Sequence, residues 1–172
     1  MISRGRAASL IVAIVAGITP ARAEPAAELT GLFMQACLPY AGNPKELRAW
    51  AAQKSLPEVP DPARTMFLHG AAGVVFDASV PPDKYVLISS DDGLCSAVTN
   101  QAKSQAVIDA LESDLKGAGI AFRLAIERND KNVSEIHDRE YLAVKNGHGW
   151  RILIATVTDP QGGQAMLTAA PE

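Results

Sequence analysis

The densest group of side chains that could move a proton lies at positions 137–140, which read His-Asp-Arg-Glu. An imidazole oriented by a carboxylate is the general base of many hydrolases. Neighbouring side chains on a strand point to opposite faces, so His137 and Asp138 could share a cleft only at an irregularity. Aliphatic residues share the phase of Asp138 and Glu140, namely Ile136, Leu142 and Val144. That phase would turn both acids inward, and we therefore expect a β-bulge near 138–140.

Cys37 and Cys95 are the two cysteines of the chain. No base stands beside either of them, two aspartates precede Cys95 closely, and a C-x-x-C redox motif is absent, so a reactive thiol is disfavoured. We predict a structural disulfide between Cys37 and Cys95. In the chain-entropy model, closing a loop of about 59 residues stabilises the folded state by about 4 kcal/mol.

The three histidines, at positions 69, 137 and 148, raise the question of a metal site. A hairpin turn at Asn146-Gly147 would pair Lys145 with His148 and His137 with Thr156. Those two histidines would then lie eight strand positions apart, or roughly 27 Å, whereas zinc ligands each lie about 2 Å from the ion. We predict no metal site and no cofactor, and we find no G-x-S-x-G nucleophile motif.

The first 23 residues read as a secretory signal peptide. Arg4 and Arg6 give a positive start, residues 7–18 are apolar, and Ala21-Arg22-Ala23 is an A-x-A cleavage site. The apolar stretch is about a dozen residues, whereas a helix that spans a bilayer needs roughly 20. We expect cleavage after Ala23, a periplasmic address and no membrane span in the mature chain. Export also favours the disulfide, because oxidants of that compartment join cysteine pairs.

Charge and length limit the classes of function. The full chain has 16 basic and 19 acidic residues, and loss of residues 1–23 removes three arginines and no acid. The mature net charge is then about −6, and its scattered lysines and arginines form no basic stripe, which disfavours a nucleic-acid partner. Residues 24–172 are enough for one domain with one core.

The hydrophobic spacing predicts three helices, three strands, one helix and four strands. The helices are expected at 28–40, where Pro39 and Gly42 interrupt the segment, at 43–54, at about 62–68 and at 101–116 with Asn100 as its cap. Turn signals at Pro81-Pro82-Asp83, Asp92-Gly93, 129–132, Asn146-Gly147 and 159–163 separate the strands. The pattern indicates an α+β fold, a mostly antiparallel sheet of about seven strands in βββ-α-ββββ order with helices on one side.

The chain resembles small exported proteobacterial proteins of uncharacterised role. The resemblance covers residues 28–115 and is carried by the Leu-Phe-Met-Gln-Ala-Cys helix ending at Cys37, the Trp50 helix and the Asp-Gly-Leu-Cys-Ser hairpin around Cys95. It implies a periplasmic address and no activity.

Together these features favour a non-catalytic binding, inhibitor or accessory protein of the cell envelope, whose partner is another protein or envelope component. Two alternatives stay open at this point. One is the hydrolase that uses His137 with Asp138 or Glu140. The other is a small-ligand carrier with a pocket between the sheet and the helix at 101–116. The oligomeric state is left open.

Overall fold

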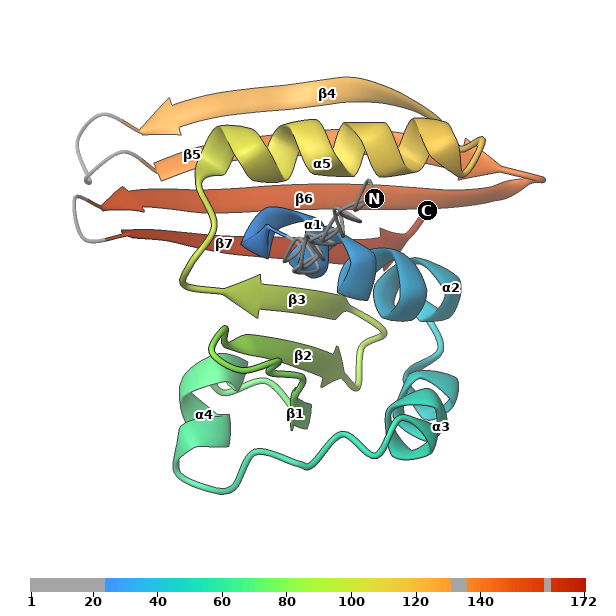
Figure 1. Cartoon of the computed structure of the whole chain (residues 1–172). Helices are drawn as coiled ribbons and strands as arrows, with labels where there is room; N and C mark the ends of the chain where they lie inside the picture. The colour runs from blue at the N-terminus through green and yellow to red at the C-terminus, as the bar shows by residue number, and fades with distance from the viewer. Residues whose placement is uncertain (1–23, 131–135, 160–161) are drawn as a thin grey trace, which may run out of the picture.

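Seven antiparallel strands form one sheet (Figure 1). The computed structural model describes residues 24–130, 136–159 and 162–172. From one edge of the sheet to the other, the strands are β1 (Gly73–Asp77), β2 (Tyr85–Ser90), β3 (Cys95–Thr99), β7 (Gly162–Pro171), β6 (His148–Asp159), β5 (Ile136–Lys145) and β4 (Ala121–Asp130). The predicted α+β class and the seven antiparallel strands are confirmed. Residues 1–23, which the sequence predicts to be a signal peptide, lie outside the described residues, as do 131–135 and 160–161, on which parts of the turns predicted at 129–132 and 159–163 fall.

Two of the predicted hairpins are fixed by residues with positive φ. Asn146 (φ 52°) and Gly147 (φ 81°) connect β5 to β6, and two positive φ angles in succession match the twist of a tight hairpin. Gly93 (φ 92°) connects β2 to β3, where an added Cβ would lie 2.9 Å from the Gly42 Cα. The Asp92-Gly93 turn therefore requires glycine both for its backbone angle and for the close approach of a second segment.

The N-terminal helix runs unbroken through three segments, α1 (Pro25–Leu32), a π-helical turn η1 (Phe33–Cys37) and α2 (Leu38–Tyr40). The expected interruption at Pro39 does not occur. Proline cannot donate the usual helical hydrogen bond, and here the preceding turn is widened, with the Leu38 N–H bonded to the Phe33 carbonyl. The helix ends at Tyr40.

The next three helices follow the predicted order. The helix α3 (Pro44–Gln53) begins at Asn43, whose side chain accepts the Glu46 N–H at 3.3 Å, and α4 (Ala63–Leu68) ends at His69 in the left-handed region. The helix α5 (Ser104–Gly117) begins three residues later than predicted, so Asn100 is not its cap. The Gln101 side chain instead accepts the Lys84 N–H at 3.1 Å, and this contact holds the segment as a connection from β3.

The main core lies between the sheet and the helices α1, η1, α3 and α5. Its fully buried side chains include Phe33, Leu47, Leu87, Leu111, Leu115, Ile152, Ile154 and Leu167. A second, smaller cluster lies on the other face of the sheet, where Phe67 and Leu68 of α4 pack on Val75, Ile88 and Val98. The expectation that all helices lie on one side is therefore wrong for α4. This helix shields Val75, Ile88 and Val98 from water on the face opposite the main core.

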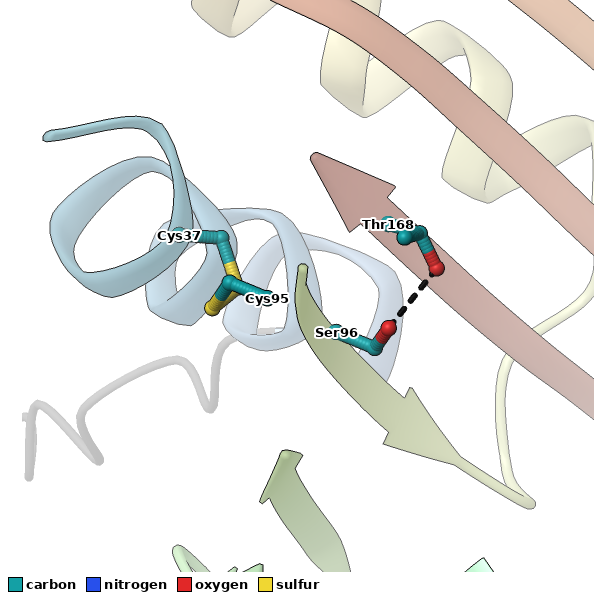
Figure 2. The surroundings of a disulfide bond; sticks show 4 residues. All are labelled: Cys37, Cys95, Ser96 and Thr168. Atoms are coloured by element: carbon teal, nitrogen blue, oxygen red, sulfur yellow. Dashed lines mark hydrogen bonds between the residues drawn. A yellow bond between two sulfur atoms is a disulfide. The ribbon is translucent and has the colours of Figure 1, made fainter. Parts of the chain in front are cut away.

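The predicted disulfide joins Cys37 of η1 to Cys95 of β3, with a Cα–Cα distance of 5.0 Å (Figure 2). Both cysteines are fully buried. The bond links the N-terminal helix to the centre of the sheet, and next to it the Ser96 and Thr168 hydroxyls are 2.8 Å apart across β3 and β7. None of the helices in the described part of the chain is long and apolar enough to cross a membrane.

Candidate functional site

Strand β5 carries the residues from which a hydrolase was considered, and it is regular along its whole length. Lys145 pairs with His148 and His137 pairs with Thr156, as the turn at Asn146-Gly147 predicts. The bulge lies instead in the neighbouring strand β4, between Leu124 and Ile126. The prediction of a bulge at 138–140 is therefore wrong, and alternation along β5 is unbroken.

This regularity separates His137 from both acids of the hydrolase hypothesis. His137 and Tyr141 point toward α5, whereas Asp138 and Glu140 point to the opposite face of the sheet. Glu140 is bonded there to Arg151, with Nε and Nη2 at 3.0 and 2.8 Å from Oε1. A general base built from His137 with Asp138 or Glu140 does not exist in this fold.

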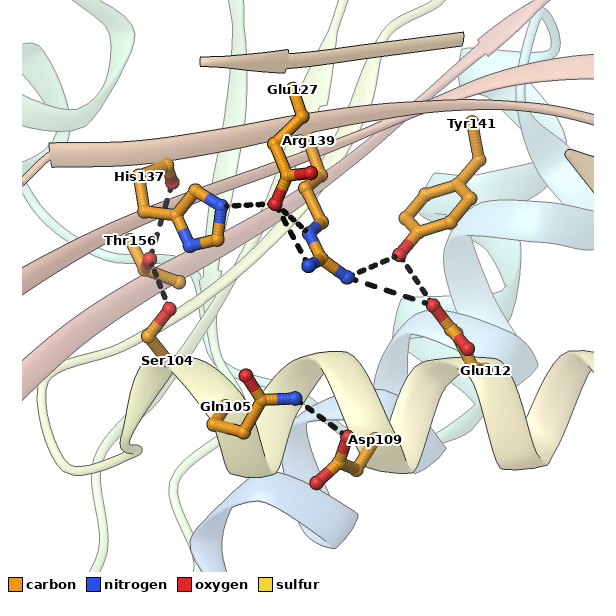
Figure 3. A network of polar contacts seen from close by, with 9 residues as sticks. All are labelled: Ser104, Gln105, Asp109, Glu112, Glu127, His137, Arg139, Tyr141 and Thr156. Atoms are coloured by element: carbon orange, nitrogen blue, oxygen red, sulfur yellow. Dashed lines mark hydrogen bonds and ion pairs between the residues drawn. The ribbon is translucent and has the colours of Figure 1, made fainter. Parts of the chain in front are cut away.

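The side chains that point toward α5 form a polar network (Figure 3). Its centre is the Oε1 atom of Glu127 on β4, which lies 3.0 Å from His137 Nε2. The same oxygen accepts from Arg139, with Nε at 2.9 Å and Nη2 at 2.8 Å. One carboxylate oxygen of β4 is thus hydrogen-bonded to both the His137 and the Arg139 side chains of β5.

The network continues from β5 to α5 through Tyr141. The Tyr141 hydroxyl donates to Glu112 Oε1 at 2.8 Å and accepts from Arg139 Nη1 at 3.4 Å. At the start of α5 the Ser104 and Thr156 hydroxyls are 2.8 Å apart, and Thr156 donates to the His137 carbonyl at 3.2 Å. These contacts join α5 directly to β5 and β6, and through Arg139 and Glu127 indirectly to β4.

The electrostatics of the network match a structural role. The hydrogen bond from His137, followed by that from Arg139, lowers the pKa of Glu127 below its ordinary value. Burial raises the pKa of Tyr141, which keeps its proton and donates it to Glu112. The bond with Tyr141 is the main cause that raises the pKa of Arg139. The charges of Glu112, Glu127 and Arg139 thus each have a partner among the described residues.

Two other sites were considered from the sequence, a histidine metal site and a ligand pocket between the sheet and α5. His137 and His148 lie at opposite ends of the β5–β6 hairpin, and within the described residues no group of three histidines, cysteines or acids converges. The contact of α5 with the sheet is filled by Val107, Leu111 and Leu115, all fully buried. The carrier hypothesis needed a pocket at that contact, and the described side chains pack it closed.

The opposite face of strands β4, β5 and β6 has no helix over it among the described residues. We call its side chains the open face: Arg123, Ile126, Arg128, Asp138, Glu140, Leu142, Val144, Arg151, Leu153 and Ala155. Val144 is 49% exposed. At one end of this face an open depression of about 330 Å³ is lined by Ala121, Phe122, Arg123, 142–144 and Glu172.

The two edges of the sheet also differ. The outer edge of β1 is paired, since the Val59 N–H donates to the Val75 carbonyl and the Asp77 N–H to the Pro57 carbonyl, both at 2.8 Å. Strand β4 ends the sheet on the other side, and no described residue pairs with its outer backbone groups. Leu124 of β4 is 45% exposed. The open face and the open edge meet along this strand.

No protein-family model matches this chain, and no curated protein or solved structure is significantly similar to it. The function must therefore be inferred from the side chains and the fold.

The sequence analysis did not predict that Glu112, Glu127, Arg139 and Tyr141 form one network. The strand pattern contained part of this information, because Arg139 and Tyr141 are two residues apart and share one face of a regular strand.

Proposed function

We propose that this chain is an exported periplasmic protein that acts without catalysis, as a binding, inhibitor or accessory protein of the cell envelope. Its partner is another polypeptide, which docks on the open face and the outer edge of β4. The observation that carries the proposal is the orientation of β5. Leu142 and Val144 lie on the side without a helix, whereas His137, Arg139 and Tyr141 lie beneath α5.

This orientation is the reverse of the usual arrangement in a half-covered strand, in which aliphatic side chains face the core. Aliphatic side chains of neighbouring strands adjoin the same region, namely Ile126 and Leu153. The aliphatic and polar side chains of this face are interleaved, since Leu142 lies between Arg123 and Arg151 and Glu140 lies between Ile126 and Leu153. Mixed surface of this kind is typical of non-obligate protein interfaces. Arg123, Arg128 and the Glu140–Arg151 pair supply the polar groups.

The periplasmic address rests on the sequence of residues 1–23 and on the disulfide. A buried bond between Cys37 and Cys95 is typical of proteins that fold in an oxidising compartment. An acidic mature chain with a rigid, cross-linked core is well suited to present a fixed surface to a partner. The polar network serves the same purpose, because it immobilises β4 and β5 against α5.

The address is tested by expressing the chain with its own first 23 residues in a Gram-negative host and measuring the denatured mass of the periplasmic protein. The proposal predicts a chain that begins at Glu24 and is two hydrogens lighter than its sequence. A full-length chain with free thiols that stays in the cytoplasm would contradict the address.

Binding is tested by native mass spectrometry of the protein, purified under mild conditions from the cells that naturally produce it. The proposal predicts an added polypeptide that is lost from a Val144→Asp variant, because a charge then stands in the apolar part of the open face. The matched control is Met66→Asp on α4, where the side chain is 73% exposed and the helix packs over β1 and β2 at the other end of the sheet. A bare monomer, or a partner that both variants retain, would refute the proposed function.

A further inference from the structure

Two arginines of β4 lie on the open face and are not used within the protein. Arg123 and Arg128 are exposed and make no ion pair with any residue that the structure describes. Asp138 is the strand neighbour of Arg128, yet it does not approach it within ion-pair distance. The acid nearest the middle of the face, Glu140, is already bound to Arg151. The strand thus presents two positive charges that are available to a partner.

The bulge in β4 sets the spacing of these charges. Arg123 and Arg128 are five residues apart in the sequence, but their partners on β5 are Leu142 and Asp138, which are four apart. Ala125 is the extra residue, and it has no partner in the register. A regular strand laid along the outer edge of β4 would likewise meet the two arginines at positions four residues apart. Those positions share one face of the strand and are separated by roughly 14 Å.

The side chains between the arginines define the rest of the partner strand. Ile126 lies between them on the open face, and Leu124 and Glu127 point to the other face. A matching antiparallel strand would therefore place an aliphatic residue opposite Ile126, another opposite Leu124, and a basic residue opposite Glu127. Cross-strand pairs of this kind each contribute to the stability of a sheet.

A second copy of β4 is a poor occupant of this edge. Antiparallel pairing of β4 with itself, in the register that keeps the faces matched along the whole strand, places Arg123 opposite Arg128 twice. Like charges directly opposite each other destabilise a pair of strands. Charge complementarity therefore favours a different chain, with acids where β4 has arginines.

We infer that the outer edge of β4 binds an extended segment of another polypeptide by strand addition, and that this segment carries two acidic residues four positions apart. The inference rests on the proposed function and specifies its partner. In this mode of recognition the backbone hydrogen bonds provide affinity, and alternate side chains provide specificity. Arg123 and Arg128 are the specificity residues, and Ala125 sets the spacing that they select.

The test uses the purified, oxidised protein and capped peptides. The matching peptide is Thr-Thr-Asp-Lys-Val-Val-Asp-Val-Thr, and its control, Thr-Thr-Asp-Lys-Val-Asp-Val-Val-Thr, has the same composition with its acids three apart. Binding is followed by the shifts of backbone amide resonances in ¹⁵N-labelled protein. We expect shifts confined to β4 and its neighbour β5, and a Kd up to about fivefold lower for the matching peptide, because the control can place an acid opposite only one of the two arginines and one surface charge pair contributes up to about 1 kcal/mol.

A charge-reversed variant, R123E/R128E, is paired with a third peptide, Thr-Thr-Lys-Lys-Val-Val-Lys-Val-Thr, which keeps a lysine opposite Glu127. The variant should bind this peptide and reject the acidic one, whereas the unaltered protein should do the reverse. Unchanged resonances outside β4 and β5 verify that the variant is folded. If the double variant does not fold, the single variants R123E and R128E are used in its place. Equal binding of both acidic peptides, shifts elsewhere, or no binding at millimolar peptide would overturn the inference. A polypeptide partner in the native mass spectrum would in that case still support the proposed function.

Discussion

Removal of the disulfide is the perturbation whose cost follows most directly from the structure. Cys37 and Cys95 are 58 positions apart, and the chain-entropy model for a loop of that size gives about 4 kcal/mol at 25 °C. The free energy of unfolding of a typical domain is about 5–15 kcal/mol, so the bond supplies a large share. We therefore expect the double variant Cys37→Ala/Cys95→Ala to lose about 4 kcal/mol of stability.

Urea denaturation at 25 °C, followed by circular dichroism, measures this loss. The m value should rise in the variant, because an unfolded chain without the cross-link is more expanded. In a thermal scan the melting temperature should fall by about 12 °C, at roughly 3 °C for each kcal/mol in a chain of this length. Reductant is the control, since it should destabilise the unaltered protein and leave the variant unchanged. A loss below about 1 kcal/mol would refute the reasoning.

Three further predictions concern the network and the core. Tyr141→Phe removes the hydroxyl that bridges two charged side chains, and thermal unfolding should show a loss of about 1–2 kcal/mol. The pKa of Glu127 is lowered in the folded state, so its stabilisation is present above pH 4.5 and disappears as the pH falls through the folded pKa. The stability difference between the unaltered protein and Glu127→Gln, measured in urea, should therefore shrink from pH 5 to pH 3. Leu111→Ala empties a fully buried site and should cost about 3 kcal/mol, against about 0.5 kcal/mol or less for the exposed Asp109→Ala.

The elements that local chemistry determines could be predicted from the sequence. The Asn43-Pro44 start of α3, the turns at Asp92-Gly93 and Asn146-Gly147, and the register of the β5–β6 hairpin all follow from a few adjacent residues. The pairing of Cys37 with Cys95 could be predicted because the chain has two cysteines and its first 23 residues predict export. Each of these depends on backbone angles, caps or chain closure and not on distant packing.

The orientation of β5 could not be predicted in the same way. Aliphatic residues at 142 and 144 indicated that their side was buried, and the bulge was introduced to reconcile the two acids with that side. The structure places α5 over the other side, where Glu112 accepts from Tyr141 and Glu127 accepts from Arg139. Partners on a helix and on a neighbouring strand make burial of these polar groups favourable, and periodicity within one strand carries no information about them.

The position of α4 was missed for a related reason. Strands β2 and β3 are buried along most of their length, so both faces need cover. A sheet with one wet face was expected from the alternation seen in the C-terminal strands. The two halves of the sheet in fact differ, and the open face is confined to the side of β4, β5 and β6.

In-cell photo-cross-linking at Leu124 tests most directly whether the β4 side is where a partner binds. Benzoylphenylalanine would replace Leu124, which is 45% exposed on β4, or Met66, which is 73% exposed on α4. The account predicts a discrete cross-linked adduct with a polypeptide from position 124 and none from position 66. Adducts from position 66 alone, or the same adducts from both positions, would contradict it.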